Sequence, residues 1–121
     1  MESLSFSSSL HLSACGQTAS LNKSFKLSPY IEAGLIKSIT VTSTFDDYGS
    51  ASINGKGVGS CNLGAYQSCY DRSQISVIDK SNLKNINSLS GYATSWSDPY
   101  GVCADNGNGT KIFVYIKINY Y

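Results

Sequence analysis

The chain has 121 residues, which is a typical length for one domain, and we expect a single domain over 1–121. Nine basic and eight acidic side chains leave a net charge of +1 without a basic stripe, which argues against nucleic acid as a partner. No apolar run approaches the length of a membrane-spanning helix, and a hydrophobic fraction of 41% argues against global disorder.

Alternation of apolar and polar residues predicts β-strands along most of the chain. Asn54-Gly55 is the strongest hairpin signal, because both residue types tolerate positive φ. The segment from Ser28 to Gly34 can hold a single helical turn, and no stretch predicts a long amphipathic helix. Short strands separated by regular turns predict an all-β sandwich or barrel. In chain order, the alternating segments are 4–12, 21–27, 39–45, 51–53, 75–77, 92–96 and 112–120.

The four cysteines, Cys15, Cys61, Cys69 and Cys103, favour two disulfides over a metal site. They include no C-x-x-C pair, and His11 is the single histidine, whereas zinc needs four ligands at characteristic spacing. Four cysteines allow three pairings, of which we favour Cys61–Cys69 with Cys15–Cys103. Disulfides predict an oxidising compartment, namely the periplasm, the cell surface or the exterior.

The segment Phe45-Asp46-Asp47-Tyr48-Gly49-Ser50-Ala51-Ser52-Ile53-Asn54-Gly55-Lys56-Gly57-Val58-Gly59 resembles part of the galactose-binding-like jelly rolls. Those domains carry an aromatic–acidic start, a strand and an N-G hairpin in this order. The segment 75–87 is similar to their next strand, although the usual Gly before Asn is absent. The resemblance implies a jelly-roll-type β-sandwich of the galactose-binding-like class.

A second resemblance is to the TraN-type mating-pair stabilisation proteins of conjugative plasmids. It rests on Thr42-Ser43-Thr44-Phe45-Asp46-Asp47-Tyr48 and on Ile53-Asn54-Gly55. The family implies a non-enzymatic adhesion domain that recognises an outer-membrane protein of the recipient cell. We therefore expect a piece of a longer secreted or outer-membrane protein that does not itself span the membrane.

Two segments are candidate recognition surfaces. The first is a loop closed by the expected Cys61–Cys69 bridge, because a constrained loop loses little entropy on binding. The second lies between Tyr92 and Tyr100, although a lone tryptophan such as Trp96 more often belongs to the core of a sandwich. For the loop residues, a binding role and a plain solvated loop both remain open. The expected binding residues are Tyr66, Gln67, Tyr70, Asp71, Arg72, Trp96 and Tyr100.

Other functions have weaker support. A carbohydrate-binding module would stack sugars on Trp96 and Tyr100, and a structural domain of a phage tail or surface fibre is a further alternative. An enzyme is not expected, because His11 has no visible catalytic partner.

No cofactor is expected from the sequence. Asp46 and Asp47 are neighbours whose side chains should point to opposite faces of a strand, so they are not expected to form an acid–base pair. We expect one of them to cap a turn or to bond backbone amides near Tyr48, with a structural calcium site as the alternative. The oxygen-rich segment 105–109 departs from the calcium-loop pattern and predicts a hairpin loop instead.

Overall fold

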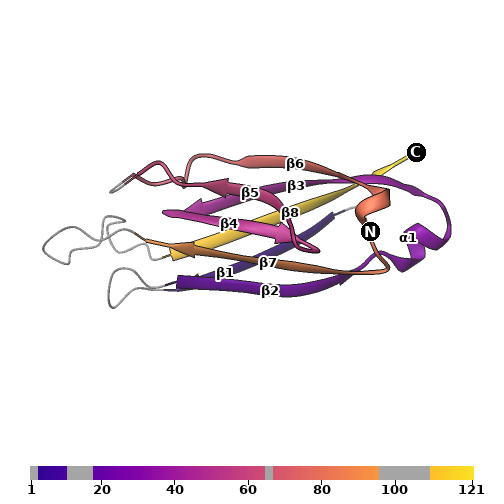
Figure 1. Cartoon of the computed structure of the whole chain (residues 1–121), viewed down its shortest axis with the longest axis horizontal. Helices are drawn as coiled ribbons and strands as arrows, with labels where there is room; N and C mark the ends of the chain where they lie inside the picture. Colours follow the sequence, from indigo (N-terminus) through magenta and orange to yellow (C-terminus); the bar gives the residue numbers. More distant parts are fainter. Residues whose placement is uncertain (1–2, 11–17, 65–66, 96–109) are drawn as a thin grey trace, which may run out of the picture.

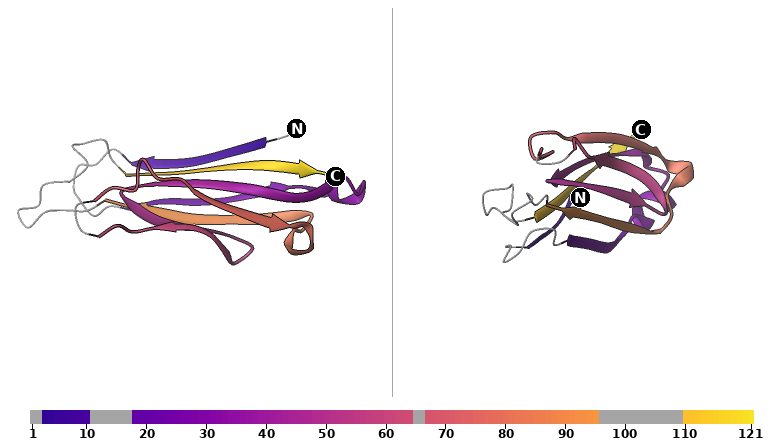
Figure 2. Two further views of the ribbon diagram at one scale, coloured as in Figure 1. Left: turned by 90° about the horizontal axis from the view of Figure 1, so that it is seen from above. Right: turned by 60° about the vertical axis from the view of Figure 1, so that its left-hand side comes forward.

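The computed structural model describes residues 3–10, 18–64, 67–95 and 110–121. These residues form two antiparallel four-stranded sheets that pack face to face, as Figures 1 and 2 show. The first sheet has the order β1 (Ser3–Leu10), β8 (Thr110–Tyr120), β3 (Ile36–Asp46) and β6 (Gln74–Asp79). The second sheet has the order β2 (Thr18–Lys26), β7 (Ile86–Thr94), β4 (Tyr48–Ile53) and β5 (Lys56–Cys61). The predicted all-β class is thus confirmed.

The chain crosses between the two sheets at every connection except the β4–β5 hairpin. As a result, each strand of one sheet contacts its chain neighbour in the other: β1 with β2, β3 with β4, β5 with β6, and β7 with β8. Strands that pair within a sheet are therefore mostly distant in sequence, and Ser3 pairs with Lys117. The sandwich is held by long-range pairing.

The core lies between the sheets and follows the period-two pattern of the strands. In β8, the residues Ile112, Val114, Ile116 and Ile118 are all buried, as the alternation predicts. Phe45 of β3 is fully buried. Burying each such side chain contributes about 1.5–3 kcal/mol relative to leaving it in water. The other large, fully buried apolar side chains are Leu21, Leu27, Ile36, Ile39, Val41, Ile53 and Leu89.

The predicted hairpin at Asn54-Gly55 and the predicted helical turn after Ser28 are both confirmed. Asn54 and Gly55 join β4 to β5 with φ angles of 52° and 82°, which are left-handed conformations that these residue types tolerate. The predicted helical turn is α1 (Ser28–Glu32), which has Pro29 in its first turn, where the missing N–H costs nothing. A 3₁₀ turn, η1 (Lys80–Asn82), was not predicted.

The Asn54 side chain also ties the hairpin to β7. Its Nδ2 donates to Asn87 Oδ1 at 3.0 Å, and its Oδ1 accepts from the Ser88 N–H at 2.9 Å. Asn87 is fully buried, and its amide exchanges two hydrogen bonds of 2.8 Å with the backbone of Lys84. A buried amide with these partners specifies how the hairpin, the β6–β7 connection and β7 fit together.

The strands differ from the predictions in two places. β6 forms as expected, but Ile75 and Val77 face solvent and are 70% and 63% exposed, while Ile78 is the buried residue of that edge strand. β7 begins at Ile86, well before the predicted segment 92–96. The sequence did not predict this start because small and polar residues occupy much of the inward face of the strand. Trp96 lies outside the described residues.

Candidate functional site

A disulfide closes the loop that follows β5. Cys61, the last residue of β5, is bonded to Cys69 with an S–S distance of 2.11 Å and a Cα–Cα distance of 6.1 Å. Both cysteines are buried. The predicted Cys61–Cys69 pairing is confirmed, whereas Cys15 and Cys103 lie outside the described residues.

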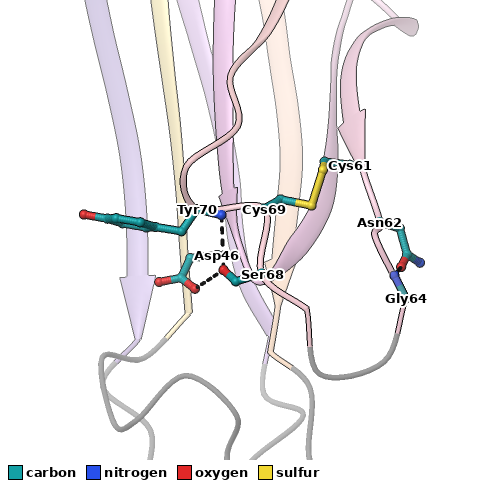
Figure 3. The surroundings of a disulfide bond; sticks show 7 residues. All are labelled: Asp46, Cys61, Asn62, Gly64, Ser68, Cys69 and Tyr70. Atoms are coloured by element: carbon teal, nitrogen blue, oxygen red, sulfur yellow. Dashed lines mark hydrogen bonds between the residues drawn. A yellow bond between two sulfur atoms is a disulfide. The ribbon is translucent and has the colours of Figure 1, made fainter.

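The second half of this loop is hydrogen-bonded to the end of β3, as Figure 3 shows. The Cys69 N–H donates to the Asp47 carbonyl at 2.7 Å. Ser68 Oγ donates to Asp46 Oδ1 at 3.2 Å. Ser68 Oγ also accepts from the Tyr70 N–H at 3.1 Å. A chain of polar contacts thus fixes residues 68–70 against the sandwich, in addition to the covalent link.

The first half of the loop contains a turn that is stabilised by local hydrogen bonds. Asn62 Oδ1 accepts from the Gly64 N–H at 3.0 Å, and Gly64 has a φ of 104°, which favours glycine. The Gly64 carbonyl accepts from the Gln67 N–H at 3.2 Å. These contacts order the backbone on both sides of residues 65–66.

The predicted binding residues on the loop point to solvent while their backbone is held. Gln67, Tyr70, Asp71 and Arg72 are exposed, and Tyr70 is 60% exposed. The Tyr70 side chain and the disulfide project to opposite sides of the loop backbone (Figure 3). The described part of the loop therefore combines a fixed main chain with accessible side chains. Tyr66, Trp96 and Tyr100 lie outside the described residues.

Tyr70 also borders a small pocket at the end of the first sheet. The pocket has a volume of about 250 Å³ and is lined by Thr44, Asp46, Tyr70, Lys111 and Phe113. Two partly exposed aromatic rings, one ammonium group and one carboxyl group meet here. This combination suits a protein ligand that offers one apolar or planar side chain together with charged groups. We name this pocket and residues 67–72 the tip site.

Sequence reasoning missed Phe113 and Lys111 as members of the tip site. Both lie on the outward face of β8, and the alternation of that strand placed them there correctly. Their proximity to the loop follows from the pairing of Lys111 with Asp46, which joins segments far apart in the chain. Only the register of β3 and β8 reveals that contact.

Asp46 and Asp47 are both buried, at 7% and 1% exposure. β3 ends at Asp46, and the chain then passes into the second sheet through a cis peptide bond between the two residues. The Asp46 carboxylate accepts from Ser68, and the Asp47 N–H donates to the Thr94 carbonyl at 3.1 Å. Within the described ranges, no three His, Cys, Asp or Glu side chains gather as metal ligands.

No helix within the described residues has the length and apolar character needed to cross a membrane. The segment 105–109 and His11 lie outside those residues. In comparisons with known proteins, neither a protein-family model nor a curated protein matches the chain.

Proposed function

We propose that the chain is a non-enzymatic, extracellular binding domain that contacts another protein through the tip site. The observation that carries this proposal is the arrangement of residues 67–72. A disulfide at Cys69 and hydrogen bonds to Asp46 and Asp47 hold this segment in place, while Tyr70 and Arg72 remain exposed. Such preorganisation lowers the entropy lost on association. Tyrosine and arginine are also enriched among the residues that dominate binding energy.

The proposed fold type is a jelly roll. Support comes from the strand order, in which the chain alternates between two four-stranded antiparallel sheets and makes a single hairpin within one sheet. The galactose-binding-like subdivision rests on the resemblance of residues 45–59, which hold the end of β3, β4 and most of β5. Folds of this type host many functions, so the tip site carries the functional proposal rather than the fold.

The proposed partner is an outer-membrane protein of a recipient cell during conjugation. This partner follows from the resemblance of residues 42–48 and 53–55 to TraN-type proteins. The Cys61–Cys69 disulfide favours an oxidising location such as the outer-membrane surface, because thiols in the cytosol are kept reduced.

The proposal predicts that the oxidised domain binds intact recipient bacteria and, in excess, competes with plasmid transfer. Binding of fluorescently labelled domain can be measured by flow cytometry. The double variant Tyr70→Ala/Arg72→Ala should lose at least about tenfold in affinity, because truncating a residue that dominates the binding energy of an interface costs about 2 kcal/mol or more. Tyr121→Ala is a matched control, since Tyr121 is an exposed tyrosine that follows the end of β8 beside Ile36, far from the Asp46 end of β3 where the tip site lies.

Surface proteolysis of the recipient cells should abolish binding, and mass spectrometry of an outer-membrane pull-down would identify the receptor. Equal binding by wild type and the folded double variant would contradict the assignment of the tip site. Binding that survives proteolysis of the cells would contradict a protein receptor.

A further inference from the structure

The outer face of the second sheet forms a groove that is separate from the tip site. The groove has a volume of about 870 Å³. It crosses β2, β7, β4 and β5, whose outward residues pair in rows, and it extends onto Gln74, Ile75 and Ser76 of β6 in the first sheet. One row contains Ser20, Tyr92, Ser50 and Ser60, and the next contains Asn22, Ser90, Ser52 and Gly57. Most of this surface is therefore made of small hydroxyl and amide side chains.

The hollow has a structural cause on the opposite side of the same sheet. Glycine or alanine occupies several inward positions of β4, β5 and β7, and Gly91 lies in the middle of them. A Cβ atom at Gly91 would lie 2.7 Å from Ile112 Cδ1, so the backbone of β7 approaches the first sheet more closely than a larger residue would allow. The centre of the second sheet is drawn toward the core, and its outer surface recedes. On that outer surface, Gly57 leaves open space where a side chain would stand.

The groove contains no charged residue among the residues that line it. This is not a uniform property of the surface, because the outward face of β8 in the first sheet carries Lys111 and Lys117 beside two exposed aromatic residues. A phosphate, a uronic acid or a charged peptide would find no opposite charge in the groove. The exposed large apolar side chains of the groove are Ile75 and Tyr92, and the polar side chains around them are serine, asparagine and glutamine.

Tyr92 is the aromatic residue of the groove. It is 41% exposed and lies between Ser20 and Ser50 in the register of the sheet. An accessible phenol ring offers an apolar face and a polar hydroxyl group. Around it, Ser and Asn side chains both donate and accept hydrogen bonds, and Ser52 and Ser90 already share one at 3.0 Å.

We propose that this groove binds a neutral oligosaccharide of hexose units. A sugar ring has an apolar C–H face that can stack on Tyr92, and equatorial hydroxyl groups that match the donors and acceptors of Ser20, Asn22, Ser50 and Ser90. Small-molecule sites commonly combine a shaped surface with a few polar groups that fix the ligand's orientation. This proposal does not depend on the tip site, and it uses none of that site's residues.

Isothermal titration calorimetry of the oxidised domain against neutral hexasaccharides tests the proposal. Cellohexaose, laminarihexaose and mannohexaose serve as neutral probes, and a galacturonic acid hexamer serves as the anionic probe. We expect at least one neutral probe to bind with a Kd of about 1 mM or tighter. Added salt should leave this affinity unchanged, since no charge takes part, and the anionic probe should not bind.

Variants locate the site. Tyr92→Ala should weaken binding at least about tenfold, or about 1.4 kcal/mol, because the apolar contact with the ring is lost. Tyr92→Phe keeps the ring and should retain most of the affinity. Gly57→Leu should block the groove without disturbing the fold, because the new side chain enters open space. Tyr115→Ala is the matched control on the other sheet, where Tyr115 is similarly exposed.

The binding experiments on the groove can fail or succeed independently of those on the tip site. Tyr70→Ala/Arg72→Ala should bind the oligosaccharide like the wild-type domain, so the failure of either proposal leaves the other intact. The groove assignment is overturned if none of the neutral probes binds at millimolar concentration. It is equally overturned if Tyr92→Ala and Gly57→Leu bind as tightly as the wild-type domain.

Discussion

Individual glycines determine how closely the strands and sheets approach. A Cβ atom at Gly49 would overlap the Tyr92 carbonyl oxygen and lie 2.9 Å from Phe45 Cδ1. Neither neighbour can move away easily, because one is backbone and the other is a fully buried ring. Gly57 is the contrasting case, since a Cβ there would meet no atom within 4 Å.

We therefore expect Gly49→Ala to lower the free energy of unfolding by about 2–3 kcal/mol or more, as overpacked cores do. Gly57→Ala should change it by less than about 1 kcal/mol and can raise it, because glycine weakens a strand interior. Urea unfolding of the two variants measures the difference. Similar stabilities for the two would show that β4 and β7 tolerate a shift at Gly49.

The Asp79 carboxyl group is expected to make the stability of the fold depend on pH. It is the N-cap of η1, and its carboxylate accepts from the Ser81 N–H at 3.2 Å and from Ser81 Oγ at 3.0 Å. The backbone bond from Ser81, followed by the hydroxyl bond, lowers the pKa of Asp79 below its ordinary value of 3.8. A carboxyl group with a depressed pKa stabilises the folded state above its unfolded pKa, and this contribution is lost as the pH falls through the folded value.

Asp79→Asn should accordingly lower Tm at neutral pH, where the wild-type carboxylate is ionised. The difference in Tm between the two proteins should shrink as the pH falls below 3.8. Thermal unfolding followed by circular dichroism across this range checks the expectation. A Tm difference that is constant at all pH values would show that the effect comes from altered hydrogen bonding to Ser81 and not from the charge of Asp79.

At the level of elements, the β4–β5 hairpin shows what local sequence can predict. Asn54-Gly55 indicated the turn because its backbone requirement is local, and β8 was equally clear because its apolar residues alternate without interruption. The start of β7 was missed because Asn87, Ser88, Ser90 and Gly91 carry little hydrophobic pattern. Asn87 is buried for its hydrogen bonds, and no periodicity can reveal partners that lie elsewhere in the fold.

The hairpin offers a test of the two roles of Asn54. Asn54→Gly keeps a residue that tolerates positive φ but removes the bonds to Asn87 and Ser88, so we expect a loss of about 1–3 kcal/mol in unfolding free energy. Asn54→Ala should lose about 1 kcal/mol more, because alanine is strained at a φ of 52°. Equal losses for the two variants in urea unfolding would show that the side-chain bonds alone matter.

The disulfide loop is the second element with a measurable contribution. Cys61 and Cys69 are separated by eight positions, and a loop of this size is expected to stabilise the fold by about 2–3 kcal/mol through the unfolded state. The double variant Cys61→Ala/Cys69→Ala should lose that amount in urea unfolding under non-reducing conditions. It should also bind recipient cells more weakly than its stability alone explains, because residues 67–72 are then held only by hydrogen bonds. Full binding by this variant would contradict preorganisation as the role of the bridge.

At the scale of the whole molecule, the fold is determined by pairing between strands that are far apart in the sequence. The sequence predicted most strands and the sandwich class, but alternation contains no information on which strands pair. The tip site illustrates the consequence: its loop residues and the Cys61–Cys69 bridge were predicted, whereas Lys111 and Phe113 join them only through the register of β3 with β8. The groove was missed entirely, because serine-rich strands look merely solvent-exposed until four of them lie side by side.

The same topology predicts slow folding. β1 and β8 pair residues from the two ends of the described chain, and the four-stranded first sheet is complete only when these ends meet. All-β domains dominated by such distant pairs refold in milliseconds to seconds. Stopped-flow fluorescence after dilution of urea from the oxidised protein should show this range. A microsecond phase that recovers the full native signal would contradict it.

The two ends of the described chain lie together, at the end of the sandwich opposite the β5–β6 loop (Figures 1 and 2). The register explains this arrangement, since β8 starts beside Asp46 near the tip site and finishes beside Ile36. A surface or a tag joined to residue 121 would therefore leave the tip site facing outward and the groove facing sideways. If both proposals hold, a protein bound at the tip site and an oligosaccharide bound in the groove would lie on different sides of the domain and would not compete for the same residues.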